Sequence, residues 1–299
     1  TDYSRLAGGN YNATTDNKWS FTQFGSRVIV GNIGDATQYI DVDLGSANFA
    51  ALSNAPQARY WTTVGDFLVA ASLSTDTRAV KNSAINDSEG WTVGTNLCDQ
   101  QSFAEGGRVT GMVGGEFGYV AQERSFRRMI FQPGSDYAFR FEQIDRERGC
   151  AAGYSLIGVG SYAFFLSDDG FYRIGPDGVN AIGAEVFNTW FADHSDATRY
   201  FEVLGFRDPF GPRVGWAFYN ASGDVDYTYQ LIFNWKTNRA SYAIITTEYI
   251  ANYATAGVSL ESLDTPYPNL DVDVPFSLDS RVWEGGIPAL AAVNGDGYL

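Results

Sequence analysis

The acidic pair Asp168 and Asp169 lies in the segment FFLSDDGFYRIG, between two aromatic runs. Adjacent carboxylates could bind a divalent cation, or they could act as the acid and base of a hydrolase. Asp and Gly are also the residues that a tight turn selects, because Asp bonds to nearby backbone and Gly adopts positive φ without steric cost. If the segment is one copy of a repeated strand–turn–strand unit, the pair is structural.

Other residues with catalytic potential have simpler interpretations. His194, the single histidine, is flanked by Asp193 and Asp196, as a Ser-His-Asp triad would allow, but geometry defines a triad and we expect a surface histidine. The segment GVGSYA (158–163) has the letters of a dinucleotide-binding turn, yet strand residues follow where that turn requires a helix. We therefore predict no catalytic residue and no bound cofactor.

Metal ligands show no recognisable spacing. One histidine and two distant cysteines, Cys98 and Cys150, exclude an ordinary zinc site. The cysteines also define no disulfide framework, and we expect two free thiols, with a Cys98–Cys150 pair as the alternative. Two carboxylate pairs could bind calcium but belong to no EF-hand-like series: Asp41/Asp43 and Asp271/Asp273. We predict no metal site.

Composition indicates a β-rich protein. Of 299 residues, 15% are aromatic and 33 are glycine, as expected for many short strands joined by tight turns. The sequence contains no apolar run of about 18 residues, so we expect no membrane insertion. The net charge of −15 argues against wrapping nucleic acid, although an acidic wall could border a path along which DNA moves without adhering.

A repeated unit is present. Five stretches share an apolar strand, a Gly-containing turn and a second apolar strand: FTQFGSRVIVGN (21–32), WTTVGDFLVAAS (61–72), TGMVGGEFGYVAQE (110–123), SLIGVGSYAFFLSDDGFYRI (155–174) and VLGFRDPFGPRVGWAFYN (203–220). Their second strands begin near Arg27, Phe67, Phe117, Tyr162 and Arg213, at intervals of 40, 50, 45 and 51 residues. A four-stranded propeller blade has this period.

We therefore predict an all-β fold, a β-propeller of about six four-stranded blades, as a single domain over 1–299. Weaker strand pairs, such as RMIFQPGSDYAFRFEQI, would be the outer strands of their blades. The best helix candidate, AEVFNTWFADHSD near 184–196, should be short. In this scheme YAFFLS and FYRIG are neighbouring blade strands, and Asp168 and Asp169 belong to the turn between them.

Arginine is concentrated between residues 124 and 148. Overall it outnumbers lysine 17 to 3. The segment could form solvated strand faces paired with nearby Glu and Asp, or a contact with another subunit, where Arg is favoured over Lys. The candidate subunit-contact residues are Arg124, Arg127, Arg128, Arg146 and Arg148.

Several segments resemble a known family. WSFTQFGSRVIVGNIGDATQYIDV, from Trp19, is similar to the opening blade of the packaged-DNA stabilisation, tail hub or nozzle proteins of podovirus-like phages. The shared features are a Trp, an FG-x-R-V-I strand and a T-Q-Y segment. APQARYWTTVGDFLVAA and FFLSDDGFYRIGPDGVNAIGAEVFNTWF also fit, and the resemblance covers about residues 15 to 250.

The resemblance implies a structural virion protein rather than an enzyme. Such proteins form a ring, usually a hexamer, below the portal and head-to-tail adaptor, where they retain packaged DNA and provide its exit channel. We then expect a tail protein, or a segment of a longer one, that assembles in the host cytoplasm and contacts itself, the adaptor and other tail proteins. DNA would pass without sequence-specific binding. The alternative is a carbohydrate-binding or glycoside-hydrolysing propeller.

Overall fold

The structure is a computed structural model, which describes residues 11–12, 14, 17–42, 48–184, 187–220, 223–224, 226–254, 277 and 288–293. Antiparallel strands make up nearly all of its regular structure. Helices within these residues are short: α1 (Asn188–His194) and the 3-10 helices η1 (Gly153–Ser155) and η2 (Ala197–Glu202). The short helix expected near 184–196 is confirmed.

Contacts divide the chain into two compact units, Thr1–Gly205 and Phe206–Leu299. The first unit contains four successive four-stranded antiparallel sheets, called blades 1 to 4. Blade 1 comprises β1 (Ser20–Phe24), β2 (Arg27–Gly31), β3 (Gln38–Asp41) and β4 (Ala50–Ala51). Blade 2 comprises β5 (Ala58–Val64), β6 (Phe67–Leu73), β7 (Ala79–Asn82) and β8 (Asp99–Ser102). Blade 3 comprises β9 (Val109–Val113), β10 (Gly118–Gln122), β11 (Phe126–Phe131) and β12 (Phe139–Asp145). Blade 4 comprises β13 (Ile157–Val159), β14 (Tyr162–Ser167), β15 (Gly170–Gly175) and β16 (Gly178–Ala181).

A fifth sheet has the same strand order. It comprises β17 (Leu204–Arg207), which begins at the end of the first unit, and then β18 (Arg213–Phe218), β19 (Tyr227–Asn234) and β20 (Arg239–Thr247). The second unit also holds a two-stranded sheet of β21 (Tyr249–Ala254) and β22 (Pro288–Val293). Five four-stranded blades of this kind define a β-propeller, so the predicted all-β propeller of about six blades is confirmed. A single domain over 1–299 stays a prediction.

The predicted blade hairpins are confirmed. The second strands begin at Arg27, Phe67, Gly118, Tyr162 and Arg213, within one residue of the predicted starts. The weaker pair in RMIFQPGSDYAFRFEQI forms β11 and β12, the two outer strands of blade 3. The sequence period thus follows the physical repeat of the fold.

Glycine is required at the first residue of three blade turns. Gly25, Gly65 and Gly160 each have φ between 54° and 59°, in the left-handed region that side chains with a Cβ disfavour. Each begins a two-residue loop between the first two strands of its blade. Such loops match the twist of paired strands when their first residue has positive φ.

The core of the first unit lies between its blades. All seven residues of β6 are buried, and its side chains alternate between two layers. Leu68 and Ala70 pack in the layer shared with blade 1, whereas Phe67, Val69 and Ala71 pack in the layer shared with blade 3. A third layer lies between blades 3 and 4. Both faces of the central strands are therefore covered.

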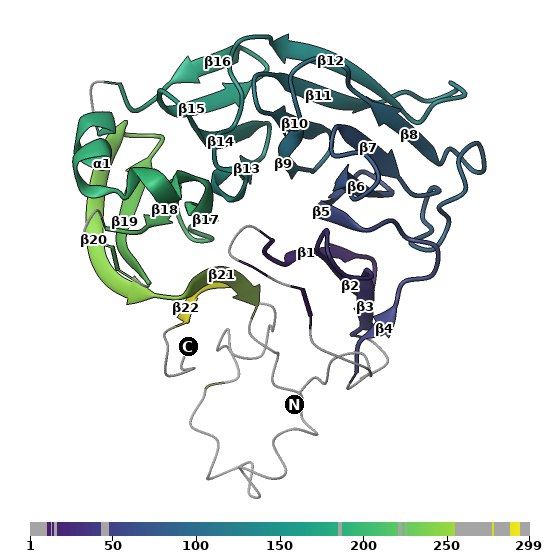
Figure 1. Cartoon of the computed structure of the whole chain (residues 1–299), viewed down its shortest axis with the longest axis horizontal. Helices are drawn as coiled ribbons and strands as arrows, with labels where there is room; N and C mark the ends of the chain where they lie inside the picture. The colour runs from purple at the N-terminus through teal and green to yellow at the C-terminus, as the bar shows by residue number, and fades with distance from the viewer. Residues whose placement is uncertain are drawn as a thin grey trace, which may run out of the picture. The chain divides into compact units, whose positions relative to one another are not determined.

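The blades of the first unit follow one another along an arc, with the first strand of each blade on its inner side (Figure 1). Successive blades approach closely there. Gly31, the last residue of β2, lies against Trp61 of β5, and a Cβ at Gly31 would overlap the indole ring. A small residue at this position therefore allows β2 and β5 to pack together.

Truncation of a side chain in a layer between blades should lower the free energy of unfolding. Phe67 is 1% exposed, and its ring centroid lies 5.0 Å from that of Phe139. Phe67→Ala should lower the free energy of unfolding by about 3–5 kcal/mol, because it leaves a cavity between blades 2 and 3. Phe21→Ala, at a side chain 57% exposed, should change it by less than about 1 kcal/mol. Urea unfolding followed by tryptophan fluorescence compares the two, and equal losses would contradict the layered core.

Candidate functional site

The acidic pair forms a hairpin turn. Ser167 ends β14 and pairs with Gly170 at the start of β15, so Asp168 and Asp169 are the two turn residues. Asp169 accepts a hydrogen bond from the hydroxyl of Tyr172 at 2.7 Å. Burial, followed by this bond to Asp169, raises the pKa of Tyr172. The predicted turn is confirmed.

Position 170 requires glycine more strictly than positions 168 and 169 require aspartate. Its φ is +134°, and a Cβ there would overlap the side-chain amide of Asn188. Asn188 is the first residue of α1, and its Oδ1 accepts a hydrogen bond from the backbone N–H of Phe171 at 3.2 Å. Gly170 therefore lets the turn lie directly against the helix.

The other candidates that the structure describes lie in local turns and helix ends. The Nδ1 of His194 lies 2.8 Å from the carbonyl oxygen of Trp190, whereas Asp196 caps η2 by accepting from the backbone N–H of Thr198 at 2.9 Å. The segment GVGSYA forms the β13–β14 hairpin. In the described residues no group of three or more His, Cys, Asp or Glu side chains is arranged to hold a metal. Three of the calcium candidates lie outside the described residues: Asp43, Asp271 and Asp273.

Both cysteines are free and buried. The thiol of Cys150 donates a hydrogen bond to the carbonyl oxygen of Ala152 at 3.0 Å. Burial raises the pKa of Cys150 to about 12 and also raises the pKa of Cys98. The expected free thiols are confirmed, and both are held in the protonated, poorly nucleophilic form near neutral pH.

The predicted contact arginines do not form one patch. They lie in blade 3 and in the segment after it: Arg124, Arg127, Arg128, Arg146 and Arg148. Arg127 and Arg128 are neighbours on β11, so their side chains point to opposite faces of the blade. The guanidinium of Arg127 stacks 4.6 Å from the ring centroid of Phe103, and that of Arg128 lies 6.0 Å from the ring centroid of Phe117.

Two of these side chains form ion pairs within the chain. Arg128 Nη2 lies 2.7 Å from Glu142 Oε2, across the β11–β12 pair. Arg148 Nε lies 3.5 Å from Asp169 Oδ2 in the β14–β15 turn, which joins the end of blade 3 to blade 4. The bond from Arg128 lowers the pKa of the Glu142 carboxyl. Both arginines therefore have a role inside the subunit.

The other three arginines gather at one edge of blade 3. Arg124 is exposed in the β10–β11 turn, and Arg146 is exposed directly after β12. Burial lowers the pKa of Arg127. The Glu105 carboxylate opposes this shift, and the charge of Arg146 adds to it, so both groups lie near Arg127. Neither Arg124 nor Arg146 forms an ion pair with a described residue. We call Arg124, Arg127 and Arg146 the arginine edge.

A groove adjoins the arginine edge. It has a volume of about 350 Å³, and it is lined by Arg127 and Arg140 together with aromatic rings. Tyr137 in the β11–β12 loop is 59% exposed, while Phe103 and Phe141 pack with ring centroids 5.0 Å apart. We call it the outer groove. Arginine and aromatic side chains of this kind are enriched at protein interfaces.

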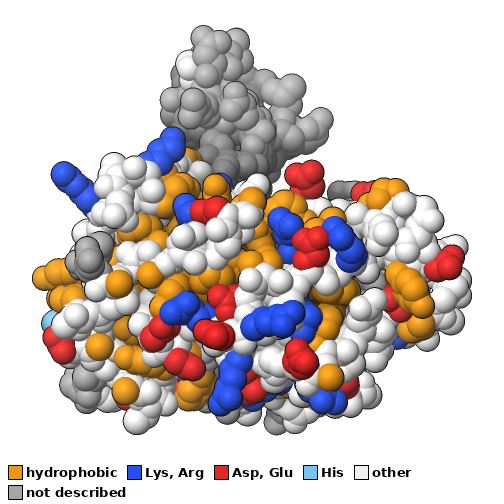
Figure 2. Space-filling view, turned by 90° about the horizontal axis from the view of Figure 1, so that it is seen from above, with side chains coloured by type: hydrophobic (Ala, Val, Ile, Leu, Met, Phe, Trp, Pro, Cys, Tyr) orange, Lys and Arg blue, Asp and Glu red, His pale blue; other side chains and the backbone are white. Residues whose placement is uncertain are grey.

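The surface around the outer strands carries both signs of charge. Figure 2, seen from above Figure 1, where β12 and β16 lie, shows basic and acidic side chains interspersed with apolar ones. Arg140, for example, lies 2.6 Å from Glu142 Oε1. This face is not a uniformly basic field of the kind that binds the DNA backbone.

Sequence reasoning missed part of this arrangement. It did not include Tyr137 or Arg140 in a site. The sequence does offer a signal there, since a strand that ends in an aromatic residue is followed by a Gly-containing loop. It also overlooked Arg59 and Arg108, which line a pocket on the inner side of blades 2 and 3. Lys18, Arg59 and Arg108 lie 41 and 49 residues apart, close to the blade period, and that spacing could have indicated them.

Comparisons with known proteins concern the fold. No family model and no curated protein match the chain. The chain resembles dihydro-heme d1 dehydrogenase NirN in complex with DHE (TM-score 0.48, 10% identity, 80% of this chain and 49% of that one). It also resembles AztD from Citrobacter koseri (TM-score 0.48, 14% identity, 77% of this chain and 58% of that one). A third similar structure is Hsv2 from Kluyveromyces lactis (TM-score 0.46, 10% identity, 80% of this chain and 71% of that one). The chain thus corresponds to about half the length of NirN. Nothing about ligand or activity follows from such distant likeness.

Across the described part of the chain, helices fall short of the length and apolarity needed to traverse a bilayer.

The turn should tolerate loss of charge better than loss of glycine. Asp168→Asn with Asp169→Asn should cost less than about 1 kcal/mol of stability, because Asn suits turns and the Arg148–Asp169 pair is exposed. Gly170→Ala should cost more, because it combines a disfavoured φ with an overlap at Asn188. Thermal unfolding of both variants tests this order, and the reverse order would contradict the structural role of Gly170.

The thiols should resist modification in the folded protein. With its pKa raised to about 12, Cys150 is almost entirely protonated at pH 8, and Cys98 is also buried. A thiol reagent at pH 8 should therefore titrate close to zero groups in native protein and two in denaturant. Stoichiometric reaction of the native chain would show that one of the buried sites opens readily.

Proposed function

We propose that the chain is a non-enzymatic structural subunit of a phage tail. Copies of it form a ring, a hub or nozzle, below the portal and head-to-tail adaptor, retain packaged DNA and enclose its exit channel. The ring is a hexamer that contacts the adaptor and other tail proteins in the virion, after assembly in the host cytoplasm. DNA passes through without sequence-specific binding and the subunit inserts into no membrane.

The observation that carries this proposal is the outer groove beside the arginine edge. Arg124 and Arg146 are exposed at the end of blade 3 where β11 begins, and Arg127 of β11 lines the groove together with Arg140 and aromatic rings. Planar guanidinium groups bind carboxylates through two parallel hydrogen bonds, and aromatic rings supply buried area. A second copy of this chain, with its net charge of −15, offers many carboxylates as partners.

The residues of the family resemblance support the fold part of the proposal. The FG-x-R-V-I segment forms the β1–β2 hairpin, with Gly25 at the positive-φ turn position. Arg27 of that segment reaches blade 2, where its Nη1 lies 2.7 Å from Glu89 Oε1 and donates to Ser88 Oγ at 2.9 Å. These shared residues therefore build and join blades, which suits a family defined by a common scaffold rather than by common chemistry.

The acidic composition suits a channel for DNA. A wall with a net negative charge repels phosphate, so DNA does not adhere as it moves. The alternative, a carbohydrate-binding or glycoside-hydrolysing propeller, requires recognition of a sugar instead. A glycan-binding screen with the purified chain separates the two, because the ring subunit should bind no glycan.

Charge reversal at the arginine edge should break the ring. The purified chain should form rings in electron micrographs and elute at the mass of an oligomer by light scattering. Arg124→Glu with Arg146→Glu should shift it to monomers, because both side chains are exposed and their reversal repels an acidic neighbour. Higher salt should weaken the wild-type ring in the same direction.

Arg213→Glu is the matched control. Its side chain is 52% exposed and lies 2.5 Å from Asp208 in the fifth sheet, outside the arginine edge. This variant should keep the ring. Rings that persist in the Arg124/Arg146 variant would place the contact elsewhere, whereas a wild-type chain that stays monomeric at high concentration would overturn the proposed function itself.

A further inference from the structure

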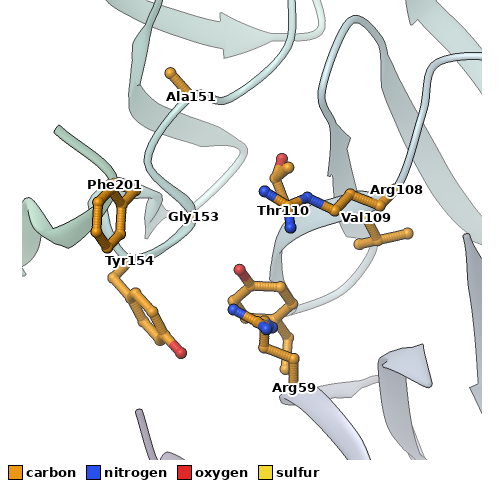
Figure 3. Close-up of a pocket in the computed structure, with 9 residues that line it drawn as sticks. Arg59, Arg108, Val109, Thr110, Ala151, Gly153, Tyr154 and Phe201 are labelled. Atoms are coloured by element: carbon orange, nitrogen blue, oxygen red, sulfur yellow. The ribbon is translucent and has the colours of Figure 1, made fainter. Parts of the chain in front are cut away.

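A small pocket opens on the inner side of blades 2 and 3. It has a volume of about 260 Å³ and lies among the start of β5, the start of β9 and the segment around η1 (Figure 3). Arg59 is the second residue of β5, and Arg108 directly precedes β9. Because both residues lie at the start of the first strand of successive blades, the fold brings two guanidinium groups to one cavity. We call it the inner pocket.

The charge of the inner pocket is opposite to that of the whole chain. Arg59 and Arg108 both line it, and none of the described residues in its walls carries a carboxylate. Arg108 also pairs outside the lining with Glu123, whose Oε1 lies 3.0 Å from Nε. That contact uses one edge of the guanidinium, and a guanidinium has five N–H donors in all. A third cation, Lys18 Nζ, lies 5.3 Å from the ring centroid of Tyr154 in the pocket wall.

A buried hydroxyl in the wall lacks a partner. Thr110 is 7% exposed and lines the inner pocket, and its Oγ1 forms no hydrogen bond with any described residue. Buried hydroxyls are usually bonded, because leaving one unsatisfied is costly. A ligand or an ordered water in the pocket would satisfy Thr110. This observation is independent of the two arginines.

The backbone of η1 packs closely against β5 and β9 beside the inner pocket. A Cβ on Gly153 would overlap the carbonyl oxygen of Thr110 and the hydroxyl of Tyr60. On the same side, Tyr154 and the 42%-exposed Phe201 present aromatic rings. The pocket therefore combines a cationic side with an aromatic side in a space that fits only a small molecule.

We propose that the inner pocket binds a small oxyanion, a phosphate- or carboxylate-bearing molecule, between Arg59 and Arg108. The guanidinium groups hold the oxygen atoms through paired charge-assisted hydrogen bonds. The Thr110 hydroxyl donates one further bond to the oxyanion, and Tyr154 and Phe201 contact the apolar part of the ligand. This binding is separate from ring assembly, since none of these residues belongs to the arginine edge or the outer groove.

Calorimetric titration of the full chain at pH 7 tests the proposal, with inorganic phosphate in one series and succinate in another. Binding of phosphate alone identifies a phosphate site, binding of succinate alone a carboxylate site, and binding of both a general oxyanion site. Arg59→Gln and Arg108→Gln should each weaken the observed affinity at least tenfold. Thr110→Val keeps the shape of the side chain and should weaken it about threefold.

Arg213→Gln is the control, because its side chain is 52% exposed and lines neither the inner pocket nor the outer groove. Its affinity should stay within about twofold of wild type. Arg108→Gln acts at a side chain 60% exposed, so it tests binding even if Arg59→Gln unfolds the chain. Absence of binding of both anions at about 10 mM, or equal affinity in the Arg108 and Arg213 variants, would overturn the proposal.

Discussion

Burial of both faces of the central strands constrains the first unit more than any other feature. β6 and β10 are buried at every residue, and alternate side chains of β6 enter two different inter-blade layers. Such strands leave no face for charged groups. Small residues are then needed where blades meet, as at Gly31 beside Trp61. The charged side chains of the arginine edge, the outer groove and the inner pocket accordingly lie in turns, at strand ends and on outer strands.

Arginine suits this arrangement because its long stem crosses from one blade to the next. Arg27 of blade 1 reaches Glu89, and Arg148, after blade 3, reaches Asp169 of blade 4. These pairs are partly exposed, so each contributes at most about 1 kcal/mol, far less than the buried layers. Their effect is to fix neighbouring blades in register. The concentration of arginine near residues 124 to 148 therefore has two causes, contacts within and between the blades of the subunit and an exposed edge beyond them.

The sequence predicted the blades well because their strongest signals are local. A glycine at a two-residue turn, as at Gly25 or Gly160, reports a φ that few other residues adopt, and it marks the repeat directly. The acidic turn at Asp168 and Asp169 was predictable for the same reason. The cross-strand partners of Arg127 and Arg128, in contrast, depend on the register of β11 against β12, which a bulge beside Phe126 shifts. Partners distant in sequence, such as Arg148 and Asp169, follow only from the packing of blades.

The inner pocket shows how a repeat creates a site that no single segment encodes. Lys18, Arg59 and Arg108 each lie within two residues of the start of a first strand, in blades 1, 2 and 3. First strands of successive blades lie side by side on the inner side of the arc, so basic residues one blade apart converge (Figure 1). Their mutual repulsion disfavours this convergence unless an anion or a distant carboxylate offsets it. Glu123 offsets part of it for Arg108, the Glu202 carboxylate attracts Lys18, and an oxyanion in the inner pocket would offset it further. The repeat that builds the scaffold thus also concentrates positive charge in an otherwise acidic chain.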